Sequence, residues 1–210
     1  MAINLGGGFE PTNNAPQQNS GQQSVSLNLV KNDILDLTKR NPGLTTVDLC
    51  AGWDIANGGS DFDLDIIAFL LDENNKFQTV SNIVYFNNKT APGVVLSGDN
   101  RTGAGNGDDE VISINLPQVD PKTQRIVFAV TIFEGRERRQ TFGMINNSYV
   151  RLVDKANGGN ELCRFDLKSD GSTATAVVFS ELNRDGADWQ FKAIGEGKIA
   201  DLNELAGMYQ

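Results

Sequence analysis

The 210-residue sequence contains no histidine. This absence removes the commonest general base, the Ser-His and Cys-His nucleophile pairs and the usual mixed zinc site. Cysteine is scarce as well: Cys50 and Cys163 lie far apart inside apolar runs and form no CxxC metal or redox pattern. We therefore interpret both cysteines as buried small residues and not as a disulfide.

Long hydrophobic runs and excess positive charge are also missing. No stretch approaches the ~18 apolar residues of a membrane span, and MAINLGGGFEP lacks the basic and apolar regions of a signal peptide. We expect a cytoplasmic protein without membrane insertion. The 18 Lys and Arg residues are outnumbered by 27 Asp and Glu, which leaves a net charge of −9. This balance disfavours nucleic acid as a partner and suits bound cations.

The chain divides into a polar start and a longer patterned region. Residues 1–24 are rich in Gly, Gln, Asn and Pro and offer few apolar anchors. Such a segment buries too little apolar surface to offset its ordering entropy, so we predict a flexible tail. Residues 25–210 are long enough for one domain with a full hydrophobic core.

The patterned region is typical of a β domain. Short alternating or wholly apolar runs are separated by turn residues every dozen or so positions, and IVFAVTIF reads as a central strand buried on both faces. Glycine- and asparagine-rich turns at 157–160 and 183–186 predict two hairpins. The spacing of apolar residues in KIADLNELAGMYQ predicts a short amphipathic helix, and 135–147 is a second helical candidate. We expect a mainly β fold: a two-layer antiparallel β-sandwich with one or two short peripheral helices.

Two acid-rich segments stand out in this pattern. GWDIANGGSDFDLD supplies Asp54, Asp61, Asp63 and Asp65, and GDNRTGAGNGDDE supplies Asp99, Asp108, Asp109 and Glu110. Strand geometry would send Asp61, Asp63 and Asp65 to one side of the chain, where like charges repel. No Lys or Arg lies between Ala51 and Leu71 to relieve them.

A hard divalent cation would relieve this repulsion. Calcium takes 6 to 8 oxygen ligands from carboxylates, amides and carbonyls, and Asn57, Asn100 and Asn106 add amide oxygens beside glycines that let the loops curl. Eight carboxylates exceed what one ion needs, so they would serve two ions or hold some acids in an outer shell.

The glycine-rich acidic loop has features of other kinds of site. A plain solvated turn fits the composition. A phosphate loop lacks the required spacing and following lysine. An EF-hand would place Arg101 at the third position and Ala104 where glycine is required. A glycosidase needs two separated carboxylates in distinct environments, whereas these acids crowd together.

The motifs GWD, FDLD followed by IIAFLLD, and GDNRTGAGNGDDE together resemble the TerD family of tellurium-resistance and bacterial stress proteins. IVFAVTIFEGRERRQTFG, SYVRLVD and ADWQFKAIGEG are similar to later blocks of the same family, so the resemblance extends from about Val25 to Gln210. It implies a calcium-binding β-sandwich of the cytoplasm, linked to tellurite resistance and other stress responses, with no reaction assigned. Phe133-Glu134-Gly135 stands where many members carry a His or Asp.

The resemblance also implies a ligand set. By matching position, one or two Ca²⁺ ions would be held by Asp61, Asp63, Asp65, Asp99, Asn100, Asp108, Asp109 and Glu110, with Asp54 as a further candidate. We expect a non-enzymatic protein with protein partners in a stress-response complex. The alternative is a calcium-dependent ligand-binding module for carbohydrate or lipid headgroups, in which the metal itself touches the ligand.

Overall fold

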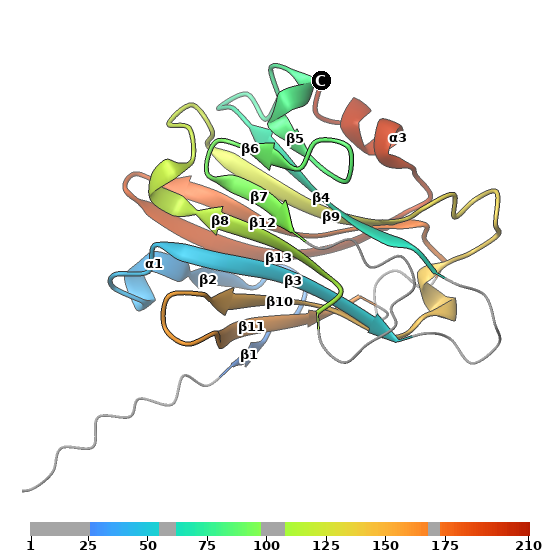
Figure 1. Cartoon of the computed structure of the whole chain (residues 1–210), viewed down its shortest axis with the longest axis horizontal. Coiled ribbons are helices and arrows are strands. Elements are labelled where there is room, and N and C mark those ends of the chain that lie inside the picture. Colours follow the sequence, from blue (N-terminus) through green and yellow to red (C-terminus); the bar gives the residue numbers. More distant parts are fainter. Residues whose placement is uncertain (1–25, 55–61, 98–107, 168–172) are drawn as a thin grey trace, which may run out of the picture.

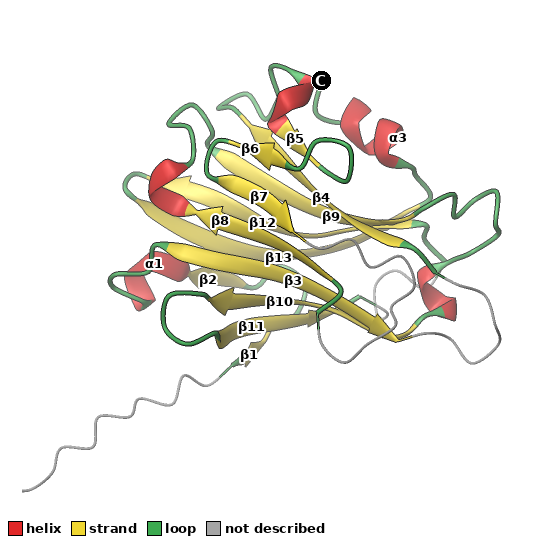
Figure 2. Ribbon diagram, in the orientation of Figure 1, coloured by secondary structure: helices red, strands yellow, loops and turns green. Residues whose placement is uncertain are grey.

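The computed structural model of the chain describes residues 26–54, 62–97, 108–167 and 173–210. Over these residues the protein forms two β-sheets packed face to face, with short helices at the margins (Figure 1). Colouring by secondary structure shows how little of the described chain is helical (Figure 2). The fold class predicted from the sequence, a mainly β two-layer sandwich, is confirmed.

The first sheet, sheet A, has seven strands. Its spatial order is β1 (Leu27–Asn28), β11 (Asn160–Asp166), β10 (Asn146–Asp154), β3 (Thr46–Asp54), β8 (Glu110–Asn115), β7 (Val94–Ser97) and β6 (Thr90–Ala91). All neighbours pair antiparallel except β1 and β11, which run parallel. The sheet is therefore mixed at this edge.

The second sheet, sheet B, has six strands, all antiparallel to their neighbours. Its order is β2 (Ile34–Asp36), β13 (Asp188–Lys198), β12 (Ala176–Asp185), β9 (Arg125–Ile132), β4 (Leu64–Leu71) and β5 (Ile83–Val84). The predicted central strand is confirmed, because β9 lies between β12 and β4 and all its residues after Arg125 are buried. Both predicted hairpins, β10 with β11 and β12 with β13, are present.

Alternation along β4 explains the two layers of core. Leu64 and Ile66 pack between the sheets, whereas Ile67 and Phe69 lie on the outer face of sheet B. There they meet the predicted C-terminal helix, α3 (Leu202–Gly207). A capping box starts this helix, since Glu204 N–H donates to Asp201 Oδ1 at 2.9 Å and Asp201 N–H donates to Glu204 Oε2 at 2.8 Å.

Two local features differ from the sequence expectations. A short helix, α1 (Leu37–Arg40), follows β2, and the candidate helix at 135–147 consists of turns and a 3₁₀ turn, η3 (Phe142–Met144). Further 3₁₀ turns are η1 (Val80–Asn82) and η2 (Leu116–Gln118). In the described part of the chain, no helix is long and apolar enough to cross a bilayer.

Candidate metal site at one end of the sandwich

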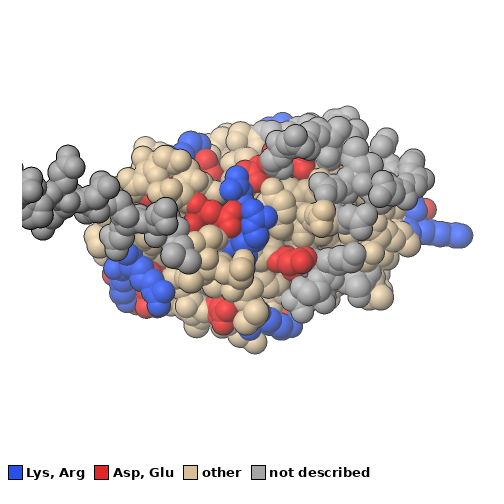
Figure 3. Space-filling view, turned by 90° about the horizontal axis from the view of Figure 1, so that it is seen from below, with Lys and Arg blue, Asp and Glu red and all other residues tan. Residues whose placement is uncertain are grey.

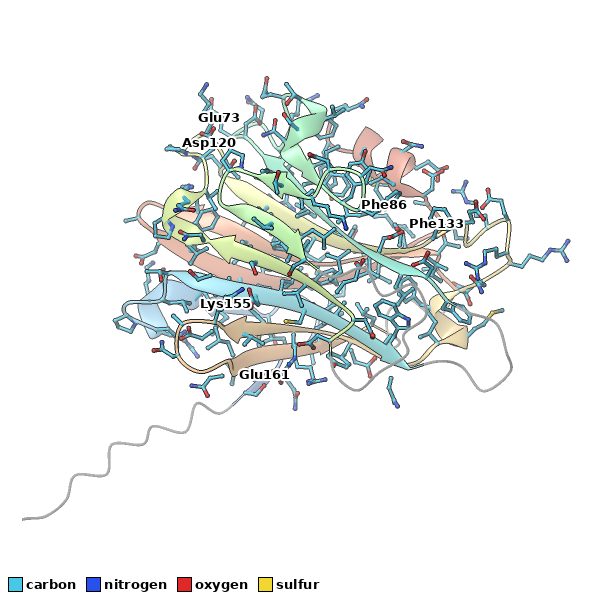
Figure 4. All side chains as sticks on the ribbon, in the orientation of Figure 1. Glu73, Phe86, Asp120, Phe133, Lys155 and Glu161 are labelled. Atoms are coloured by element: carbon cyan, nitrogen blue, oxygen red, sulfur yellow. The ribbon has the colours of Figure 1, made fainter. Side chains whose placement is uncertain are left out.

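Both acid-rich segments meet at one end of the sandwich. β3 ends at Asp54 and β8 begins at Glu110, and the two strands pair with Ala51 opposite Glu110. β7 ends beside β8, with Ser97 opposite Val111. In Figure 4, the labelled Glu73 and Asp120 lie far from these strand ends, at the other end of the molecule. Residues distant in sequence are thus brought to one place by the strand register.

Five of the candidate ligands have described side chains: Asp63, Asp65, Asp108, Asp109 and Glu110. Asp54 is the last residue of β3, and its side chain lies outside the described atoms. Asp61, Asp99 and Asn100 lie outside the described residues altogether. The complete ligand set inferred from the sequence therefore stays a prediction.

Glu110 and Asp109 are buried acids held by main-chain donors. Glu110 is 2% exposed, and its Oε2 accepts a hydrogen bond from Ile66 N–H at 2.6 Å. This bond links sheet A to the start of β4 in sheet B. Asp109 is 8% exposed, and its Oδ2 accepts from Trp53 N–H at 2.9 Å. Each contact uses one oxygen of a carboxylate, a group with about four acceptor positions.

Asp63 and Asp65 lie along the entry to β4. Phe62, Leu64 and Ile66 belong to the core between the sheets, so alternation directs Asp63 and Asp65 to the opposite side of the strand, as the sequence pattern predicts. Asp65 is 7% exposed, and its neighbour across the ladder is Thr131 of β9. The Asp63 carbonyl accepts from Phe133 N–H at 2.8 Å, which fixes the chain just before the strand.

Asp108 has a different environment from its two neighbours. Arg151 of β10 donates hydrogen bonds to both of its carboxylate oxygens, from Nε to Oδ1 at 2.9 Å and from Nη2 to Oδ2 at 2.7 Å. Burial alone would raise the pKa of Asp108, but the hydrogen bonds and charge of Arg151 outweigh burial and hold the pKa below its usual value. Sequence reasoning missed Arg151, because nothing near it signals a partner 43 positions away.

Gly52 of the GWD motif makes room for a second contact to Asp108. A Cβ at Gly52 would lie 2.6 Å from Cζ of Tyr149, so only glycine lets the tyrosine ring lie across β3. The hydroxyl of Tyr149 then donates to Asp108 Oδ1 at 3.3 Å. The guanidinium of Arg164 stacks on the ring, 4.0 Å from its centroid.

The Arg151 contact extends into a network through Glu161 of β11. Glu161 Oε2 accepts from Arg151 Nη1 at 3.2 Å and from Arg164 Nη2 at 2.9 Å, and its Oε1 accepts from Ser26 Oγ at 2.7 Å. Figure 3 shows basic and acidic side chains lying side by side near the middle of the face seen from below. Opposite charges on this face of the molecule therefore neutralise one another.

This network predicts a specific acid sensitivity. Burial opposes ionisation of Glu161, but hydrogen bonds from Arg164, Ser26 and Arg151 outweigh it and lower its pKa from 4.5 to about 2. Because the folded pKa is below the unfolded one, this stabilisation is present above pH 4.5 and is lost as pH falls toward 2. The free energy of unfolding of calcium-free protein, measured with urea between pH 4.5 and 2, should fall less steeply with decreasing pH in Glu161→Gln than in wild type. Glu196→Gln, at an exposed acid, should keep the wild-type slope; an unchanged slope in Glu161→Gln contradicts the assignment.

The chemistry available at this end is that of oxygen ligands. Asp65, Asp109 and Glu110 are buried acids, and buried carboxylates require hydrogen bonds, an ion pair or a metal. Among the residues with described side chains, no three His, Cys, Asp or Glu lie close enough to hold a metal by themselves. The described acids fit a hard cation in donor type, and a complete set would include ligands from outside the described residues.

The protein is a two-sheet β-sandwich with an acid-rich end. At that end, the GWD motif closes β3, the FDLD motif opens β4 and the GDDE motif opens β8. The TerD domain family matches residues 25–209. The chain belongs to the TerD family.

Relatives of known name support this membership. The chain is 40% identical over 188 residues to the tellurium resistance protein TerD of Serratia marcescens, covering 88% of this chain and 97% of that protein. It is 41% identical over 189 residues to general stress protein 16U of Bacillus subtilis, with 88% and 97% covered. A crystal structure of a TerD homologue from Streptomyces coelicolor superposes with a TM-score of 0.65 at 26% identity, covering 78% of this chain and 96% of that one.

Proposed function

We propose that this protein is a non-enzymatic, calcium-binding member of a bacterial stress response of the tellurium-resistance type. The observation that supports calcium most directly is the burial of Asp65, Asp109 and Glu110 at the end where the acid-rich segments meet. Bound calcium would offset the repulsion among these acids and tie the start of β4 to the start of β8. The stress-response role is inferred from the names of its relatives.

The chemistry of the residues favours calcium over softer metals. The chain has no histidine and both cysteines are buried. The Cys50 thiol contacts Asp108, but burial raises its pKa, so it does not supply a thiolate ligand. Calcium prefers oxygen ligands and tolerates irregular geometry. The candidate ligands are Asp63, Asp65, Asp108, Asp109 and Glu110, together with Asp61, Asp99 and Asn100 and with Asp54 as a further candidate.

Calorimetric titration of chelator-treated protein tests this proposal. Calcium should bind with heat that magnesium does not reproduce, since magnesium demands a smaller octahedral site. Asp63→Asn and Asp109→Asn should each weaken binding, because each amide keeps the shape of the side chain and removes its charge. Asp185→Asn, at the exposed end of β12, is the matched control and should bind as wild type does. A folded wild-type protein that takes up no calcium would refute the proposal.

One observation keeps a second function open. Phe86 and Phe133 form an edge-to-face pair with ring centroids 6.2 Å apart, and Phe133 is 41% exposed beside Asp63 (Figure 4). An exposed ring paired with a half-buried one beside the proposed cation site suits a calcium-dependent carbohydrate-binding module. Retention on a glycan array that requires both calcium and Phe133, and is lost in Phe133→Ala, would favour this alternative. Calcium binding without glycan or anionic-lipid retention would favour protein partners within a stress-response complex.

A non-enzymatic protein should also carry no reactive cysteine thiol. Only the thiolate is reactive, and burial raises the pKa of Cys50 and raises that of Cys163 to about 12. Native protein should therefore react with dithiobis(nitrobenzoic acid) far more slowly than protein in guanidinium chloride, where both thiols are accessible. Val95→Cys, at a site 45% exposed in β7, should add one rapidly reacting thiol. Rapid reaction of the native wild type would contradict this prediction.

A further inference from the structure

We infer that Arg151 is the positioning residue of the proposed calcium site and that Asp108 is its anchor, not a cation ligand. This inference rests on the proposed function and assigns two of its residues. Asp108 belongs to the same GDDE motif as Asp109 and Glu110, so the sequence alone treats the three acids as equivalent. The structure separates their roles.

The first argument is the occupancy of the Asp108 carboxylate. Both oxygens accept from Arg151, at 2.9 and 2.7 Å, and Oδ1 also lies 3.3 Å from the hydroxyl of Tyr149. A two-point guanidinium–carboxylate pair is among the strongest polar contacts in proteins and fixes orientation as well as distance. A cation would have to displace this pair to bind Asp108.

The second argument is direction. Val150 and Leu152 belong to the core between the sheets, so alternation places Arg151 on the outer face of sheet A. Asp108 reaches toward that outer face to meet it. The carboxylate of Glu110 instead reaches toward β4 of sheet B, where it contacts Ile66 N–H at 2.6 Å. Adjacent acids of one motif therefore diverge, and Asp108 points away from the β4 acids.

The third argument is what the pair holds in place. Arg151 is itself fixed by Glu161, and Glu161 by Arg164 of the same strand. Asp108 directly precedes Asp109 and Glu110, so anchoring it to β10 fixes the chain where β8 begins. A site whose ligands are already oriented loses less conformational entropy on binding. Arg151 thereby supports calcium binding without touching the ion.

A double-mutant cycle on calcium affinity tests this assignment, with Asp108→Asn, Arg151→Gln and the double variant. If Asp108 is an anchor, each single variant should bind calcium about tenfold more weakly, the usual cost of losing a supporting contact around a metal site. The double variant should bind no more weakly than the weaker single variant, because the Asp108–Arg151 pair is lost in all three.

A ligand role for Asp108 predicts the opposite sign. Removing Arg151 would then free Asp108 and leave calcium affinity unchanged or tighter, and Asp108→Asn would still weaken binding in the Arg151→Gln background. Either result overturns the inference. Lys155→Gln is the matched control, because it removes a positive charge from the same face, where Lys155 Nζ contacts Asp48 Oδ1 at 3.1 Å. It should bind calcium as wild type does.

Urea unfolding of the same four proteins in chelator separates this inference from the proposed function. A wild-type protein that binds no calcium refutes the proposed function, and the anchoring of Asp108 is then decided by the chelator series. Non-additive effects of the two substitutions on the unfolding midpoint support the anchor. Independent, additive effects overturn it.

Discussion

Saturating calcium is expected to raise the free energy of unfolding by about 4 kcal/mol at free calcium ~1,000 times the dissociation constant. The reason is mass action: the folded chain brings Asp65, Asp109 and Glu110 to one end of the sandwich, whereas the unfolded chain holds no such site. Paired urea unfolding curves, in calcium and in chelator, measure the difference. Equal midpoints in the two curves would contradict the expectation.

Glu110→Gln should remove most of this stabilisation. The amide retains an oxygen that can accept from Ile66 N–H, so the link between the sheets is preserved while the charge is lost. A roughly 100-fold loss of affinity would lower the calcium-dependent gain from about 4 to about 1.5 kcal/mol at the same free calcium. Asp185→Asn, at the β12–β13 turn, should retain the full gain. If Glu110→Gln loses stability equally in chelator and in calcium, the role of Glu110 is structural alone.

Gly93→Ala is expected to destabilise the fold by about 3 kcal/mol or more, from backbone strain combined with a close contact. Pro92 and Gly93 form the two-residue turn between β6 and β7, and Gly93 has φ of +76°. A Cβ there would lie 2.4 Å from the backbone nitrogen of Val119, in the connection between β8 and β9. Backbone atoms on both sides leave little freedom to relax.

Gly158→Ala supplies the matched control for this substitution. Gly158 has almost the same φ, +75°, but a Cβ there would meet nothing within 4 Å. It should cost only the left-handed strain, about 1 kcal/mol. The difference between the two variants in urea unfolding isolates the close approach at Gly93, and equal losses would show that the β6–β7 turn moves away from Val119 without cost.

Much of the fold could be predicted from short stretches of the sequence, because strand alternation and turn formation depend mainly on residues close together in the chain. Alternation placed Asp63 and Asp65 on the side of β4 opposite Leu64 and Ile66, and the buried run of β9 identified the central strand. The turn residues identified both long hairpins. These features depend on neighbours in sequence, which a single chain displays directly.

The run FQTVSNIVYF at 77–86 has the apolar pattern of a strand but is mostly not one, for an equally physical reason. The side chains of Thr79 and Asn82 form a reciprocal cap around η1, so the main chain turns there and only Ile83 and Val84 remain as strand. Polar side chains that bond to nearby backbone compete with a strand ladder. The apolar pattern alone does not reveal which of the two prevails.

The network around Asp108 was out of reach for a different reason. Arg151, Tyr149 and Glu161 meet Asp108 only after β8, β3, β10 and β11 are placed side by side. The requirement for glycine at Gly52 likewise depends on a ring from another strand. These contacts depend on the register between strands that are distant in sequence, and the spacing of residues within one segment does not reveal that register.

The outermost strands of the two sheets carry a consequence for behaviour at high concentration. β1, β6 and β5 have two residues each and β2 has three, so within the described residues both sheets end in very short strands. A long open strand offers unpaired N–H and C=O groups to another chain and invites edge-to-edge aggregation. Short edges give an incoming strand only a few such groups to pair with. At the described edges, this architecture therefore disfavours association of two copies by strand addition.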